Sequence, residues 1–401
     1  MKSEWSKISL GFLFLVALIG TLLRSTAFVP IPLEYVNLVH AHSHVAFQGW
    51  VYTIMILLLT ATYLRDDQIK KGRYILQFIL TILVVVGVLI SFSLQGYALY
   101  SIIFSTLFQL LNYWFVYRFL KDTKGGTGKT ISLRFVKTGL WFGILSTIMP
   151  YGIGVLSAKG LSGTEAYQSL VYTFMHLQYN GWFLFVVLGL FFKFLENNDV
   201  PFSVKHASKF YWLFTIAVIP AIALSFIGMG FSKYIMPIAY LAAALIGIAL
   251  VLFLRALPAN LFAVIRPKNM WFKIYLASFL LSFGLKTALQ CVSALPMFES
   301  YAFHNKSVII AYLHLSLIGS ISFLLLALMI ELKWLAINGF VKLGSSLLLI
   351  GFLITELLLI LRGLGLYHGH LTLAIGSAMM ALGVLFMLIS RSNKVARYGR
   401  V

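Results

Sequence analysis

The sequence predicts an all-α integral membrane protein with about twelve transmembrane helices. Of its 401 residues, 61% are hydrophobic and 10% are charged, whereas soluble domains carry about 25% charged residues. Apolar runs of about 20 residues, long enough to cross a bilayer as a helix, recur along the whole chain. We expect helices at residues 8–23, 38–64, 74–95, 98–117, 138–156, 169–193, 210–231, 234–254, 274–293, 307–330, 341–361 and 368–390.

A repeated motif predicts how these helices are organised. The stretches His44-Val-Ala-Phe-Gln-Gly-Trp50 and His176-Leu-Gln-Tyr-Asn-Gly-Trp182 both contain a histidine, an aromatic residue, an amide, a glycine and a tryptophan, in that order. The two histidines are 132 residues apart, and His314 follows after another 138, with Gly319 five residues later. A constant period of this kind indicates repeated architecture.

The short connections leave no room for a soluble domain. We therefore predict one polytopic membrane domain over residues 1–401. It is built from three quartets of helices at about 1–130, 131–260 and 261–401, in a bundle with pseudo-threefold symmetry.

The basic residues predict the orientation in the membrane. The net charge is +20. When the N-terminus and every second loop are assigned to the cytoplasm, all but six of the 31 Lys and Arg residues fall on that side. By the positive-inside rule, both termini are then cytoplasmic, as in a multi-pass protein of a bacterial inner membrane. Lipid headgroups, rather than nucleic acid, are the expected partners of this charge. The six exceptions are Arg24, Lys159, Lys233, Lys286, Lys306 and Arg362.

The histidines gather on the opposite, outer side. His44, His176 and His314 fall about six to nine residues below the outer start of their helices, or ~9–14 Å at 1.5 Å per residue. Neutral imidazole is a good ligand for iron, copper and zinc. The alternative for these three is a buried histidine bonded to a helix carbonyl or an amide. The histidines at outer helix ends are His40, His42, His304, His368 and His370.

Spacing separates the members of the first histidine cluster. His40 and His44 are four residues apart and share a helix face, whereas His42 points elsewhere. His40 and His42 are either metal ligands or part of a solvated polar cap.

Glycines and outer cations accompany the histidines. Gly49 and Gly319 either admit a flat group beside the helix or serve ordinary helix packing. Arg24 and Arg362 either bind anionic groups or extend to the interface. Glu356, about a turn and a half from Arg362, is either a proton carrier or an ion-pair partner.

These features resemble subunit I of the haem-copper oxidase superfamily, which includes respiratory oxidases and nitric oxide reductases. The shared features are histidines in the second, sixth and tenth of twelve helices and an arginine at the outer end of the eleventh. The stretch HAHSHVAFQGW also resembles the start of the second helix in NnrS-type proteins. The resemblance implies a low-spin haem b held by His314 and by one histidine of the first cluster, which is His44 by the motif, with His42 or His40 as alternatives.

The resemblance also implies roles for the remaining candidates. Arg362 and Arg24 would meet the haem propionates, and Gly49 and Gly319 would lie beside the ring. His176 occupies the helix that supplies a copper ligand in oxidases. A second metal, copper or iron, would use His176 with residues from a set of three further histidines: His304, His368 and His370.

Two departures from the family argue against a full copper centre. The seventh helix, FYWLFTIAVIPAIALSFIGMG, has no histidine pair, and the tenth has Ser316 where the family has a second histidine. The sequence thus favours a membrane haem protein that transfers electrons or binds a diatomic gas, with an electron donor or partner subunits. A second hypothesis is an oxidoreductase that reduces nitric oxide or oxygen at an unusual second metal. A third is a histidine-based metal permease without haem.

Overall fold

The computed structural model describes residues 4–124 and 130–390, and every regular element in these two ranges is helical. Eleven of the helices are long and apolar enough to cross a membrane, as expected for a multi-pass membrane protein. A bent pair, Val204–Val218 with Pro220–Phe226, gives a twelfth span if it is counted as one. The basic C-terminal residues, which were used to predict the orientation of the chain in the membrane, lie outside the described residues.

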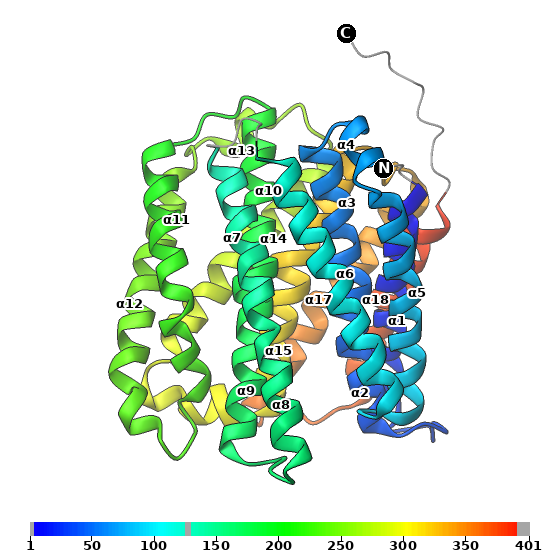
Figure 1. Cartoon of the computed structure of the whole chain (residues 1–401), viewed down its shortest axis with the longest axis vertical. Helices are drawn as coiled ribbons and strands as arrows, with labels where there is room; N and C mark the ends of the chain where they lie inside the picture. Colours follow the sequence, from blue (N-terminus) through cyan, green and yellow to red (C-terminus); the bar gives the residue numbers. More distant parts are fainter. Residues whose placement is uncertain (1–3, 125–129, 391–401) are drawn as a thin grey trace. The chain divides into compact units, whose positions relative to one another are not determined.

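The chain forms two compact units. Unit 1 comprises residues 1–124, 269–272 and 325–401, and unit 2 comprises residues 125–268 and 273–324. The first predicted quartet therefore lies in unit 1 and the second in unit 2, while the third contributes to both. Figure 1 labels most of the α-helices, numbered in chain order.

In unit 1 the elements are α1 (Glu4–Ser25), α2 (Tyr35–His44), η1 (Val45–Val51), α3 (Tyr52–Tyr63), α4 (Asp66–Lys71), α5 (Tyr74–Gln95), α6 (Leu99–Asp122), α17 (Gly339–Gly363) and α18 (Leu371–Ile389). In unit 2 they are α7 (Ile131–Ser146), α8 (Ile148–Ala158), α9 (Glu165–His176), η2 (Leu177–Phe183), α10 (Leu184–Asn197), α11 (Val204–Val218), η3 (Pro220–Phe226), α12 (Ser232–Ala256), α13 (Leu261–Val264), η4 (Pro296–Phe298), η5 (Ser300–His304), α15 (Lys306–His314) and η6 (Leu315–Ser322). Residues of α14 (Met270–Val292) and α16 (Phe323–Glu331) belong to both.

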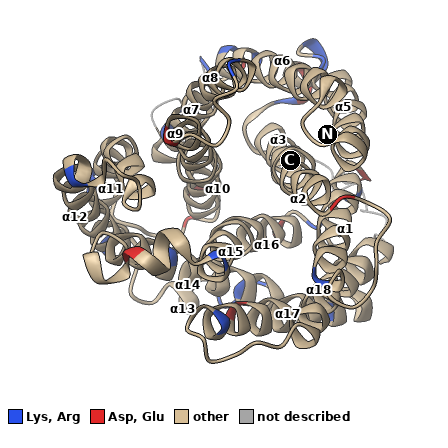
Figure 2. Cartoon of the chain, turned by 90° about the horizontal axis from the view of Figure 1, so that it is seen from below, with Lys and Arg blue, Asp and Glu red and all other residues tan. Residues whose placement is uncertain are grey.

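Glycine pairs bring two helices of unit 1 into close contact. A Cβ on Gly344 of α17 would lie 2.4 Å from the carbonyl oxygen of Gly383 on α18, and one on Gly351 would lie 2.6 Å from that of Gly376. Small residues at such crossings let membrane helices approach backbone to backbone. Helix α18 also packs along α1, as Figure 2 shows from the end of the bundle.

In unit 2 the second motif is held by two glycines of α7. A Cβ on Gly139 would lie 2.9 Å from the carbonyl oxygen of Trp182, and one on Gly143 would lie 2.7 Å from the indole ring of Trp182. This spacing of four residues is the small-residue pattern typical of membrane helix contacts. The two glycines therefore let Trp182 pack directly against α7.

The three histidine-bearing helices are more buried than the other candidate spans. In their most apolar window, 72% of the span Tyr35–Tyr63, 89% of Glu165–Asn197 and 78% of Lys306–Glu331 is buried. For the other spans described, this share is between 28% and 50%. A helix that is apolar all round is suited to such burial, so most residues in these windows face protein.

Candidate functional site

Each of the three histidines marks a change in helix geometry. Helices α2, α9 and α15 end at His44, His176 and His314, and a π-helix begins at the next residue in every case. These three π-helices, η1, η2 and η6, are followed directly by α-helix, whereas a fourth, η5, ends at His304 and is not. Short π-helical stretches within α-helices are rare and frequently lie at functional sites.

The hydrogen bonds confirm the wider turn. At the end of η1, the N–H of Tyr52 donates to the carbonyl of Phe47, five residues back. At the end of η2, the N–H of Leu184 donates to Tyr179, and at the end of η6 the N–H of Phe323 donates to Ile318, each again five residues back. The repeat inferred from histidine and glycine thus corresponds to a repeated backbone structure.

Two of the motif glycines, Gly49 and Gly181, pack against the preceding candidate span. A Cβ on Gly49 would lie 3.0 Å from the Phe12 ring of α1, and one on Gly181 would lie 3.0 Å from Phe142 of α7. These two glycines therefore admit a phenylalanine ring, which favours the helix-packing interpretation for both. Gly319 is buried in η6.

In unit 1, His40 and His44 share one face, as their spacing predicts. The His44 ring stacks on Phe92 of α5, with centroids 4.1 Å apart, and its Nε2 lies 2.9 Å from the Tyr97 hydroxyl. The His40 ring meets the Tyr97 ring edge to face at 4.7 Å. The two histidines thus form one aromatic cluster with Phe92 and Tyr97.

His42 faces α1 instead. Its Nδ1 donates to the carbonyl oxygen of Val16 over 3.0 Å. A carbonyl can only accept, so in the neutral ring the proton is on Nδ1 and Nε2 carries the lone pair. A Cβ on Gly20 would lie 3.1 Å from Cε1 of His42, so the absence of a side chain there makes room for the ring.

This arrangement fits a metal or haem ligand. Ligating histidines usually donate their second ring N–H to a carbonyl or carboxylate, which fixes the tautomer and the ring orientation. Of the three cluster histidines, His42 is therefore the best candidate for an axial ligand. Arg24 lies four residues after Gly20 on α1, one turn or ~6 Å further toward the helix end and on the same face.

Charged groups gather near the Arg24 end of α1 in unit 1. Arg24 interacts electrostatically with Arg362 and Glu356. The guanidinium nitrogens of Arg362 lie 3.3 and 3.4 Å from the two ring nitrogens of His370. His368 is exposed. The two arginines named as propionate partners thus lie in one cluster, together with a carboxylate and a histidine.

In unit 2, His176 is part of a buried chain of hydrogen bonds across three helices. Its Nε2 donates to the carbonyl oxygen of Val218 over 3.0 Å, so its Nδ1 accepts from the Asn180 amide over 3.1 Å. The Asn180 carbonyl oxygen accepts from the Lys286 amine of α14, which also donates to Gln290 over 2.9 Å.

The members of this chain are almost fully buried. His176 is 2% exposed, Lys286 1%, Asn180 4% and Gln290 7%. Intramembrane ionisable residues are rare, and they mark functional sites by default. Because both nitrogens of His176 are hydrogen bonded, a metal bound there would have to displace either Asn180 or the Val218 carbonyl.

The remaining metal candidates are dispersed. His304 is exposed at the end of η5 in unit 2, whereas His368 and His370 belong to unit 1. Among residues 4–124 and 130–390, no group of three or more His, Cys, Asp or Glu side chains has the geometry to hold a metal ion. His314 is half-buried, and Ser316 near it donates to the carbonyl of Tyr312 over 2.8 Å.

The alternative interpretation of His176, a buried histidine bonded to a helix carbonyl or an amide, is confirmed, although the sequence analysis did not name the partners. The amide four residues after the histidine is part of both close copies of the motif, as Gln48 and Asn180, and this spacing places it on the histidine's face. That signal predicts the Asn180 contact. Nothing in the sequence brings Lys286, 106 residues further along, to the same place.

Comparison with known proteins gives no family. No family model matches the chain, and no curated protein matches its sequence. The functional argument therefore rests on the residues and geometry described above.

Proposed function

We propose that the protein is a multi-pass membrane protein that binds haem b through His42 and uses it for electron transfer or for binding a diatomic gas such as nitric oxide or oxygen. The fold proposed for it is that of oxidase subunit I, in a bacterial inner membrane with both termini in the cytoplasm. The supporting observation is the His42 ring, oriented by the Val16 carbonyl and accommodated by Gly20. A bound haem would supply a redox-active iron.

In this proposal, His42, Arg24 and Arg362 of unit 1 contact different parts of the haem. His42 would coordinate the iron through Nε2, and the Val16 carbonyl, which accepts from Nδ1, would orient the ring and increase its basicity. Arg24 and Arg362 offer cationic partners for carboxylates, for which guanidinium is well suited because it forms paired, charge-assisted hydrogen bonds. His314, the second ligand that the resemblance implies, belongs to unit 2.

Gas binding or electron transfer is favoured over reduction. Reduction of nitric oxide or oxygen in the family uses a second metal, and His176 was the predicted ligand for it. Both ring nitrogens of His176 are engaged within the protein. This arrangement supports a structural or proton-linked role for His176 rather than metal ligation.

The test is the absorption spectrum of the purified protein, produced with haem available. We expect a Soret band, sharp alpha bands on reduction, and haem b in the pyridine haemochrome assay. His42→Ala should abolish the bands. Two control variants should keep the bands. His44→Ala removes a ring from the same cluster, and His206→Ala removes a ring from α11 in unit 2.

Two outcomes would contradict the proposal at different levels. A purified protein without haem, which also fails to bind added haemin, would remove the haem function altogether. Haem that is retained in His42→Ala but lost in His44→Ala would keep the function and overturn the assignment of the ligand.

A further inference from the structure

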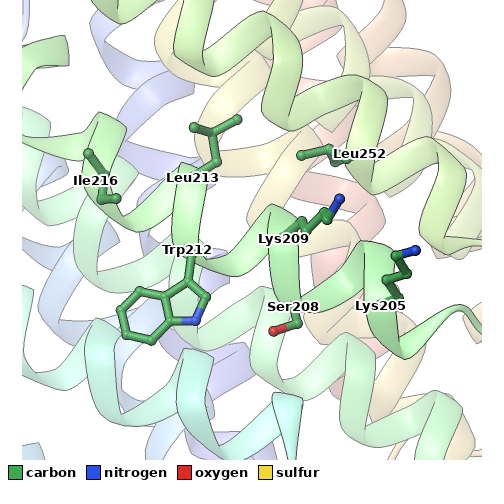
Figure 3. A pocket seen from close by; sticks show the side chains of 7 residues that line it. All are labelled: Lys205, Ser208, Lys209, Trp212, Leu213, Ile216 and Leu252. Carbon is green, nitrogen blue, oxygen red and sulfur yellow. The ribbon is translucent and has the colours of Figure 1, made fainter.

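A groove runs along one side of unit 2, between α11 and α12. It encloses about 520 Å³ and is lined by Lys205, Lys209, Trp212, Ile216 and Leu252, together with Ser208 and Leu213 (Figure 3). All the α11 residues recur at intervals of three or four, so they form one stripe along the helix.

The stripe is basic at one end and apolar at the other. Lys205 lies in the first turn of α11, and Ile216 lies eleven residues further, or about 16 Å along the axis. Both lysines are at one end, the apolar residues are at the other, and Trp212 lies between them. Tryptophan favours the boundary between headgroups and hydrocarbon, so this order matches one leaflet of a bilayer.

The exposed side chains of the groove are apolar as well as basic. Trp212 is 56% exposed and Ile216 is 60% exposed. On a membrane helix, exposure of this kind means contact with lipid. A ligand of the groove therefore has to match hydrocarbon along most of its length.

Neither lysine at the basic end has an acidic partner among the described residues. The ion pairs found there include Arg65 with Asp67 and Lys193 with Glu196, and neither pair involves Lys205 or Lys209. Arg255 of α12 is exposed and lies about one turn from Leu252. Two lysines thus line one end of an apolar groove, and Arg255 lies about one turn along α12 from a third lining residue, Leu252.

We propose that this groove binds one anionic phospholipid. Lys205 and Lys209 hold the phosphate, and an acyl chain lies along Trp212, Ile216 and Leu252. Basic pockets between membrane helices on the cytoplasmic side are suited to such headgroups, and the positive-inside orientation places this end of α11 there. The site is independent of the haem proposal.

The experiment measures lipid binding to the delipidated, full-length protein in an uncharged detergent by native mass spectrometry. The probes are phosphatidylglycerol and phosphatidylcholine with identical acyl chains. The wild type should bind phosphatidylglycerol more tightly. Near a membrane surface each lysine contributes about 1 kcal/mol to anionic lipid binding, so Lys205→Gln/Lys209→Gln should weaken binding about 30-fold.

A matched variant controls for loss of charge. Lys70→Gln/Lys71→Gln removes two basic residues from α4 in unit 1 and should leave the affinity within about threefold of the wild type. Ile216→Trp fills the apolar part while both lysines remain, and should also weaken binding.

Three results would overturn the proposal. The first is equal affinity for the two lipids, and the second is equal loss in the two double variants. The third is displacement of the lipid by millimolar inorganic phosphate with no effect of Ile216→Trp, which would indicate a site for a free anion instead.

Discussion

Replacing Asn180 by leucine tests whether the buried chain of unit 2 stabilises the protein. The Asn180 amide donates to His176, and its carbonyl oxygen accepts from Lys286. Leucine is similar in size but forms neither bond, so one ring nitrogen and one amine hydrogen lose their partners. Each buried polar group without a partner costs about 1–3 kcal/mol. We therefore expect the free energy of unfolding to fall by about 2–6 kcal/mol.

The assay is unfolding by SDS in mixed micelles, followed by tryptophan fluorescence. Asn112→Leu is the matched control, because Asn112 is also a buried asparagine on a long helix, at 1% exposure. Its Oδ1 has no hydrogen-bond partner among the described residues, so leucine there breaks no bond at that atom. We expect a change within about 1 kcal/mol.

A double-mutant cycle isolates the contact. In a Lys286→Met background the amine is already gone, so Asn180→Leu should cost about 1–3 kcal/mol less than in the wild type. Additive effects, or a loss in Asn180→Leu no larger than in Asn112→Leu, would refute the view that this hydrogen-bonded chain contributes to stability.

Two further predictions concern packing and surface charge. Gly181→Ala should lower the free energy of unfolding by about 1–3 kcal/mol in the same assay, because the added Cβ would press on Phe142. Gly154→Ala is the control and should not lower it, because no atom lies within 4 Å of the added Cβ. Equal losses in the two variants would contradict this prediction. The hydrogen bond from Arg65 lowers the pKa of Asp67, so any stability from this pair is present above the carboxylate's unfolded pKa and is lost as pH falls through the lower folded value. Because both side chains are largely exposed, Asp67→Asn should leave the unfolding midpoint at pH 7 unchanged; a shift as large as that of Asn180→Leu would contradict this.

The membrane-spanning helices, though not their arrangement, were largely predictable because lipid imposes strong rules on sequence. The expected helix at 307–330 corresponds to the span Lys306–Glu331, and that at 74–95 to α5. The helix expected at 210–231 is bent by 48° where Pro220 begins a new element. Proline removes a backbone donor and clashes with the preceding turn, but hydropathy alone does not say whether the chain bends or continues.

The site was predictable only as far as spacing reaches. The shared face of His40 and His44 follows from an interval of four residues, and the structure confirms it. The contact of His42 with Val16 and Gly20 depends on how two helices pack. Such contacts depend on tertiary structure, which no local pattern encodes.

The three π-helices also bear on the origin of the chain. A π-turn holds one more residue than the α-turn it replaces, so within a helix it corresponds to a single inserted residue. The same insertion directly follows a histidine in three segments that are 132 and 138 residues apart. If the three segments are copies of one ancestral segment, a single insertion that was copied with it accounts for all three. On this view the histidine and its widened turn are older than the repeat.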